Sequence, residues 1–153
     1  EIADGIDWNP IGDGIKRPVW YNSATEIWDT LVPKQILVSG TYLPVGYLVQ
    51  NASLISIYSS NYVRVGNMVT VSGRLDVGVL GTGTTRIGIS LPFGSNFVTW
   101  YTDCTGVATT LTNNNLSCGI YADVVNKRAE VLWNTVNVSN TDLFYHFTYR
   151  VMA

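Results

Sequence analysis

Apolar and polar residues alternate along several stretches of this chain, as they do in β-strands with one buried face. The clearest stretch is YVRVGNMVTVSGRLDV, residues 62–77. One face of its second half carries Val69, Val71, Gly73, Leu75 and Val77. Gly66-Asn67 interrupts the run, and a two-residue Gly-Asn break predicts a tight antiparallel hairpin because both residues tolerate positive φ.

Similar alternation occurs in TTRIGISL, GIYADVV, KRAEVLWNTV and the closing DLFYHFTYRV. In the last of these, one face carries Leu143, Tyr145, Phe147, Tyr149 and Val151. Asn126-Lys127 and residues 137–141 supply turn residues between the runs. Since no segment has a convincing helical period, the pattern predicts an all-β fold, an antiparallel β-sandwich that is most economically jelly-roll-like.

The first forty residues differ, because EIADGIDWNPIGDG is broken by Gly and Pro and has no sustained period. The following RPVWYNSATEIWDT predicts a small hairpin that turns at residues 22–25. An isolated two-stranded hairpin is marginally stable in water, so its large apolar residues need a cover. These residues, Trp20, Tyr21, Ile27 and Trp28, are therefore candidates for an oligomer interface, with packing against the chain's own sandwich as the alternative. We expect a neck segment over residues 1–40 and a sandwich domain over residues 41–153.

Composition narrows the possible partners. Charged residues make up 13% of the 153 positions, about half the usual share, and 9 Lys and Arg against 11 Asp and Glu form no run of either sign. This balance disfavours nucleic acid as a partner. Residues 35–63 carry no charge, but Ser, Asn, Pro and Gly recur too often there for a membrane helix. The chain starts at Glu1 without a Met or a leader pattern, so we expect a fragment of something longer.

No catalytic motif stands out, so we expect a protein that is not an enzyme and needs no cofactor. His146 is the only histidine, and no GxSxG sequence accompanies it. A glycosidase would need two of the carboxylates of Asp103, Asp123, Glu130 and Asp142 to converge. We also expect no metal site.

The two cysteines, Cys104 and Cys118, lie 14 positions apart with a polar segment between them. They could close a disulfide that stabilises the fold by about 3 kcal/mol, but two reduced thiols fit the sequence equally well. They form no CxxC pair with which to bind zinc.

The segment from Phe93 to Cys118 is the best candidate for a binding loop, because it has the composition of a long connection. Its candidate receptor-binding residues are Trp100, Tyr101, Asp103, Asn113, Asn114 and Asn115. A sugar ring has an apolar face that lies well on an aromatic side chain, and its hydroxyls suit carboxylate and amide groups. The alternative is that Trp100 and Tyr101 belong to a further strand and lie in the core or a subunit interface.

Two parts of the sequence together resemble a known arrangement. PVWYNSATEIWD looks like the small hairpin that often precedes the C-terminal domain of tailed-bacteriophage fibre and other virion proteins. The stretches YVRVGNMVTVSGRLDV, TTRIGISLPFGSNF and GIYADVVNKRAEV are similar to a β-rich C-terminal domain of phage tail-fibre and virion structural proteins. The resemblance spans the chain from about residue 17 onward, and it implies a homotrimer.

The expected function is therefore that of a virion fibre or spike component, located on the virion together with other virion proteins. Its trimeric C-terminal domain would contact a receptor on the host surface, a glycan or a protein, without catalysis. Alternatives are a capsid-associated head-fibre or decoration protein with a structural role, a secreted carbohydrate-binding module, and a small glycosidase.

Overall fold

The computed structural model describes residues 19–22, 27–30, 37–110 and 116–153. The chain divides into two compact units, residues 1–36 and residues 37–153. In the first unit, β1 (Val19–Asn22) pairs antiparallel with β2 (Ile27–Thr30), which confirms the predicted N-terminal hairpin. The turn itself lies outside the described residues apart from Asn22. The side chains of Trp20, Tyr21, Ile27 and Trp28 are not described either, so their role in an interface stays a prediction.

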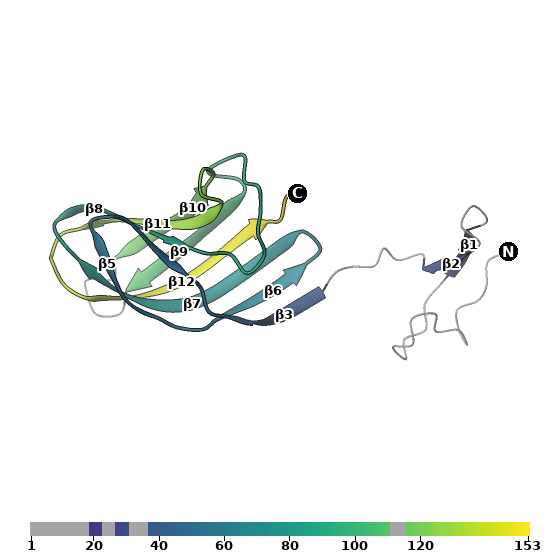
Figure 1. Ribbon diagram of the computed structural model, residues 1–153, viewed down its shortest axis with the longest axis horizontal. Coiled ribbons are helices and arrows are strands. Elements are labelled where there is room, and N and C mark those ends of the chain that lie inside the picture. The colour runs from purple at the N-terminus through teal and green to yellow at the C-terminus, as the bar shows by residue number, and fades with distance from the viewer. Residues whose placement is uncertain (1–18, 23–26, 31–36, 111–115) are drawn as a thin grey trace. The chain divides into compact units, whose positions relative to one another are not determined.

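The second unit is one antiparallel sheet of ten strands, which begins at Leu37, so the expected division after residue 40 falls within its first strand (Figure 1). The strands are β3 (Leu37–Tyr42), β4 (Gly46–Gln50), β5 (Ala52–Ile57), β6 (Ser60–Val65), β7 (Met68–Val79), β8 (Gly83–Ile89), β9 (Cys104–Thr110), β10 (Ser117–Asp123), β11 (Arg128–Thr135) and β12 (Thr141–Arg150).

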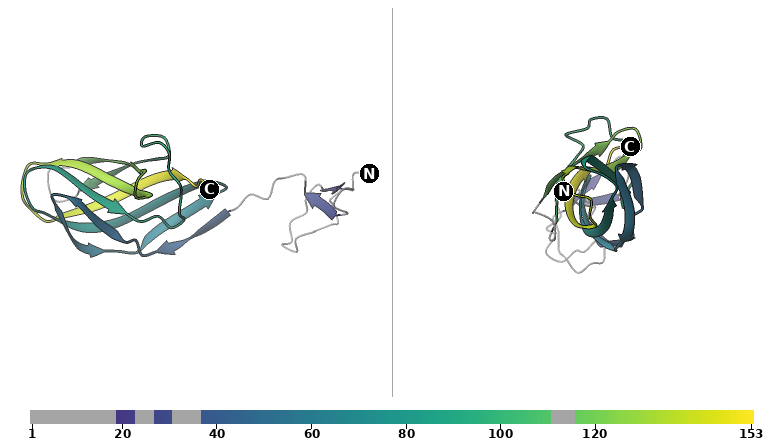
Figure 2. Two further views of the ribbon diagram at one scale, coloured as in Figure 1. Left: turned by 45° about the horizontal axis from the view of Figure 1, so that its top comes forward. Right: turned by 90° about the vertical axis from the view of Figure 1, so that its left-hand side faces the viewer.

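Hydrogen bonds join these strands in the order β3-β6-β7-β12-β9-β10-β11-β8-β4, with β5 paired to the second half of β7. The sheet curls, so that its two halves face each other across the core (Figure 2). This confirms the predicted all-β, antiparallel, sandwich-like fold, although a single continuous sheet forms both halves. No helix long and apolar enough to cross a membrane occurs in the described ranges.

The predicted hairpin at residues 66–67 is confirmed, because β6 and β7 pair with Val65 opposite Met68. Of the two turn residues, only Gly66 has a positive φ, at 59°. The turn between β10 and β11 likewise places Lys127 at a φ of 54°. Both turns lie where the sequence analysis predicts them, at turn-forming residues between two alternating stretches.

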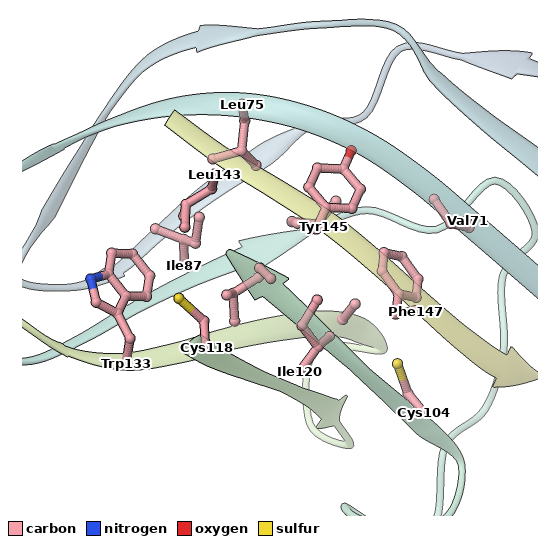
Figure 3. Close-up of a cluster of buried hydrophobic side chains, with 14 of the residues drawn as sticks. Val71, Leu75, Ile87, Cys104, Cys118, Ile120, Trp133, Leu143, Tyr145 and Phe147 are labelled. Atoms are coloured by element: carbon pink, nitrogen blue, oxygen red, sulfur yellow. The ribbon is translucent and has the colours of Figure 1, made fainter. Parts of the chain in front are cut away.

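The core is built from the faces that alternation predicts. Val69, Val71, Leu75 and Val77 of β7 are buried, as are Leu143, Tyr145, Phe147 and Tyr149 of β12. Figure 3 labels five of them, Val71, Leu75, Leu143, Tyr145 and Phe147. Val151 is only partly buried, because β12 ends at Arg150. Burial of one such side chain stabilises the fold by roughly 1.5 to 3 kcal/mol, so these two strands contribute much of the hydrophobic free energy.

The pairing of β9 with β10 excludes the disulfide between Cys104 and Cys118. Cys118 lies opposite Ala108, four residues along β9 from Cys104. At about 3.4 Å per residue, the two cysteines are about 14 Å apart along the strand direction, whereas a disulfide needs Cα atoms within about 7 Å. Figure 3 shows the two sulfurs pointing into the core with Ile120 drawn between them. Both cysteines are buried free thiols.

Burial also makes these thiols poor nucleophiles. It raises the pKa of Cys104 to about 12 and the pKa of Cys118 to about 11. Since the thiolate is the reactive species, we expect iodoacetamide at pH 8 to modify both at least a hundredfold more slowly in the folded protein than in denaturant. Mass spectrometry of the unreduced protein should then show two alkyl groups after denaturation. A protein that takes up none in denaturant until it is reduced would contradict this assignment.

Candidate functional site

The segment from Phe93 to Cys118 is not the single long connection that its composition predicts. β9 occupies Cys104–Thr110, so the connection from β8 ends at residue 103. Trp100 and Tyr101 lie in its last turn and are 47% and 81% exposed, and so they are not part of a buried strand. Residues 113–115, the three asparagines, lie outside the described residues. Of the candidate binding residues, the structure therefore places Trp100, Tyr101 and Asp103 in one turn.

Asp103 holds this turn in shape. Its carboxylate accepts hydrogen bonds from the backbone N–H groups of Thr99 at 2.7 Å and Val98 at 2.8 Å. These bonds lower the pKa of Asp103, with that from Thr99 as the largest cause. One oxygen of the Asp103 carboxylate therefore fixes the shape of the turn that carries the two aromatic residues.

Backbone contacts anchor the same turn to the sheet. The N–H of Ala122 in β10 donates to the carbonyl of Trp100 at 3.0 Å, and the N–H of Arg150 in β12 donates to the carbonyl of Asp103 at 2.9 Å. An exposed turn that is fixed at both of these points loses little conformational entropy when it binds a ligand.

The indole ring of Trp100 stacks on Tyr121, which projects from the outer face of β10. The ring centroids are 6.2 Å apart and the planes differ by 8°, which is an offset stacked arrangement. Because Tyr121 supports the ring while 47% of Trp100 stays exposed, the indole offers a firmly held aromatic surface to solvent.

Tyr121 is itself held by two charged residues, one on the adjacent strand β11 and one on β8, the strand beyond it. Its hydroxyl donates a hydrogen bond to the carboxylate of Glu130, the residue paired with Tyr121 on β11, and accepts one from Arg86 of β8 at 2.6 Å. Arg86 also pairs with Glu130. Burial, followed by the hydrogen bond to Glu130, raises the pKa of Tyr121, so the hydroxyl stays protonated near pH 7. We call Trp100, Tyr121, Arg86 and Glu130 the Trp100 platform.

Exposure within the Trp100 platform decides which groups can reach a ligand. The carboxylate of Glu130 is nearly buried, with 4% of its side chain exposed, whereas 30% of the Arg86 side chain is exposed. Glu130 thus serves to orient Arg86 and Tyr121. The guanidinium of Arg86 lies 5.9 Å from the centre of the Tyr121 ring. A group with hydrogen-bond donors beside aromatic rings is the combination that sugar rings and their hydroxyls require.

The four carboxylates considered for glycosidase chemistry each have partners of their own. Asp123 accepts hydrogen bonds from Asn126 and Arg128, and Asp142 pairs with Arg74 at 3.3 Å. Asp103 and Glu130 are engaged as described above. His146 is exposed on the outer face of β12. Among the residues that the structure describes, no three His, Cys, Asp or Glu side chains form a group that could hold a metal ion.

Sequence reasoning missed Arg86 and Tyr121 as site residues, and it considered Glu130 only as a carboxylate for glycosidase chemistry. All three occupy outward positions of strands that the sequence predicts, where polar residues are ordinarily solvent-facing. The burial of Glu130 results from its pairing with Arg86, which lies 44 positions earlier in the chain, and no local pattern signals it.

Comparisons with known proteins gave one distant structural similarity. No protein-family model matches the sequence, and no match was found among curated proteins. Among solved structures, the chain is similar to the crystal structure of a reovirus attachment protein, sigma1, in complex with alpha-2,3-sialyllactose. That similarity has a TM-score of 0.48 at 9% sequence identity and covers 88% of this chain and 76% of the other. So distant a likeness does not assign the chain to a family.

Proposed function

We propose that this chain is a non-enzymatic, receptor-binding component of a virion, and that it binds a glycan of the host surface at the Trp100 platform. The observation that carries the proposal is the exposed indole of Trp100, stacked on Tyr121, whose hydroxyl accepts a hydrogen bond from Arg86, a residue with a partly exposed side chain. Tyr101, which is 81% exposed in the same turn, offers a second aromatic surface.

The proposal includes assembly into a trimer of a tailed-bacteriophage fibre or spike. Its support is the paired β1–β2 hairpin, whose sequence has four large apolar residues and which resembles the hairpin of phage fibre proteins. A single shallow sugar site binds weakly, so three sites on one particle would raise the overall affinity by multivalency. A secreted carbohydrate-binding module would use the same platform as a monomer, and a capsid-associated structural protein would bind no glycan.

Glycan binding should depend on the indole of Trp100. We expect the unmodified chain to retain particular oligosaccharides on a glycan array, and Trp100→Ala to weaken that binding at least tenfold, because it removes the stacking surface. The matched control is Val98→Ala, which changes a residue 75% exposed in the same connection and leaves the platform intact. Isothermal titration with the retained sugar gives the two affinities.

Three results would count against the proposal. An unmodified chain that binds no glycan would favour the structural role, and equal affinities for Trp100→Ala and Val98→Ala would move the site elsewhere. A monomer by multi-angle light scattering that still binds sugar would favour the secreted module.

A further inference from the structure

The outer face of the sheet from β3 to β9 has an unusual composition. It is formed by the outward positions of residues 37–41 in β3, 61–65 in β6, 68–72 in β7, 146–148 in β12 and 105–109 in β9. None of these positions is Asp, Glu, Lys or Arg. We call this surface the uncharged face, and Arg74 and Arg150 are the first charged residues beyond it on β7 and β12.

The register shows that the uncharged face is continuous. One row across the strands joins Ser39, Val63, Thr70, Thr148 and Thr105, each paired with the next. Apolar side chains on either side of this row are well exposed, among them Leu37 at 72%, Val107 at 60% and Met68 at 48%. The uncharged face shares one property with the core of a protein interface, which is its lack of charged residues.

The edge of the same face is also unprotected. β3 is the end strand in the hydrogen-bonded order, and among the described strands it pairs with β6 alone. Its sequence, LVSGTY, contains neither a charged residue nor a proline. Proteins ordinarily guard an exposed edge strand with such residues, because its free backbone groups can pair with another chain.

We infer that the uncharged face packs against further copies of this chain in the assembled protein. The inference rests on the self-assembly included in the proposed function, and it assigns a contact within the sheet domain in addition to the hairpin. In a cyclic assembly, residues near the symmetry axis meet their own copies, so a charged side chain there would meet the same charge. A face without charged residues avoids this repulsion.

The uncharged face is too small to hold an assembly by itself, so we expect a second contact between the copies. Five strands spaced about 4.8 Å apart and three rows of outward residues spaced about 6.8 Å apart cover roughly 400 Å² per copy. A stable interface usually buries about 800 Å² per partner. We therefore expect this face to strengthen an assembly that residues 1–36 also hold.

The experiment introduces like charges into the face. In Val107→Lys, copies of the new lysine would lie close together, so analytical ultracentrifugation should show a dissociation constant at least tenfold above that of the unmodified trimer. Val138→Lys is the matched control, since Val138 is 61% exposed, against 60% for Val107, and lies in the connection between β11 and β12. At concentrations where the chains are dissociated, both variants should unfold at the temperature of the unmodified chain, because both positions face solvent in the single chain.

The outcomes separate this inference from the proposed function. If Val107→Lys assembles as tightly as Val138→Lys, the inference is overturned. The proposed glycan site would be unaffected by that result, because it is tested separately by the loss of binding in Trp100→Ala. An unmodified chain that is a monomer would overturn both the trimer and this contact.

A second readout uses proximity instead of repulsion. In Val107→Cys, the introduced thiol is exposed while the two native thiols are buried, so a short bismaleimide should crosslink copies through residue 107. Val138→Cys should give at least fivefold less crosslinked product, and equal yields would overturn the inference.

Discussion

Gly106→Ala should destabilise the protein by about 3 kcal/mol or prevent folding, because no space exists for the added methyl group. Gly106 lies in β9 opposite Phe147 of β12. A Cβ atom there would approach the carbonyl oxygen of His146 at 2.3 Å and the Cα and Cβ atoms of Phe147 at 2.6 and 2.5 Å. These atoms belong to the backbone or lie next to it and cannot rotate away, so β9 and β12 would have to separate at the centre of the sheet.

Gly119→Ala is the matched control for Gly106→Ala. Gly119 lies on β10, paired with Val107 of β9, and a Cβ atom there would meet nothing within 4 Å. Its expected effect is within about 0.5 kcal/mol, as for most surface substitutions. Urea unfolding followed by tryptophan fluorescence gives the two free energies of unfolding. Similar values for the two variants would show that β9 and β12 do not approach each other this closely.

Glu130→Leu should also cost about 3 kcal/mol of unfolding free energy, since it removes one partner of a buried ion pair. The variant would leave the guanidinium of Arg86 without its carboxylate and the hydroxyl of Tyr121 without its acceptor. Because 30% of the Arg86 side chain is exposed, water relieves part of the cost, and we expect the lower end of the range known for such pairs. Glycan binding should weaken as well, because Tyr121 supports Trp100.

Two further variants test the cause of this loss. Arg86→Leu combined with Glu130→Leu should regain at least half of the lost stability, because no unpaired charge remains. Asp142→Leu should stay close to the unmodified protein, since Arg74 keeps Asp76 as a partner and that pair is more exposed. A double variant no more stable than Glu130→Leu would mean that packing, and not charge pairing, is what Glu130 contributes.

The sequence predicts the strands whose inward positions hold large side chains. β7 and β12 follow from the alternation of Val, Leu and aromatic residues with polar ones. The sequence does not predict β9. Its inward residues are too small or too polar to form an apolar pattern; they are Cys104, Gly106, Ala108 and Thr110. The sequence does not predict β4 either, because four of its five residues are exposed and buried and exposed positions do not alternate.

The candidate site is predictable only in part, for a physical reason. Trp100 and Tyr101 attract attention in the sequence as adjacent aromatic residues in a polar segment. The residues that hold Trp100 in place, Tyr121, Glu130 and Arg86, come from three strands, and only the register of β8, β10 and β11 brings them together. Register depends on the whole sheet, so a local pattern does not contain it.

The hydrogen bonds that anchor the Trp100 turn have a practical consequence for handling the protein. Arg150 pairs with Met68, Met68 with Val65, and Val65 with Leu37, so the start of β3 and the end of β12 lie at the same end of the sheet, with β6 and β7 between them. The carbonyl of Met152 accepts a hydrogen bond from Asn96, within the connection that carries Trp100. An affinity tag or fluorophore fused after Ala153 would therefore crowd the Trp100 platform and depress measured affinities. Labels for binding assays belong at the opposite end, where the connection at residues 80–82 leaves β7.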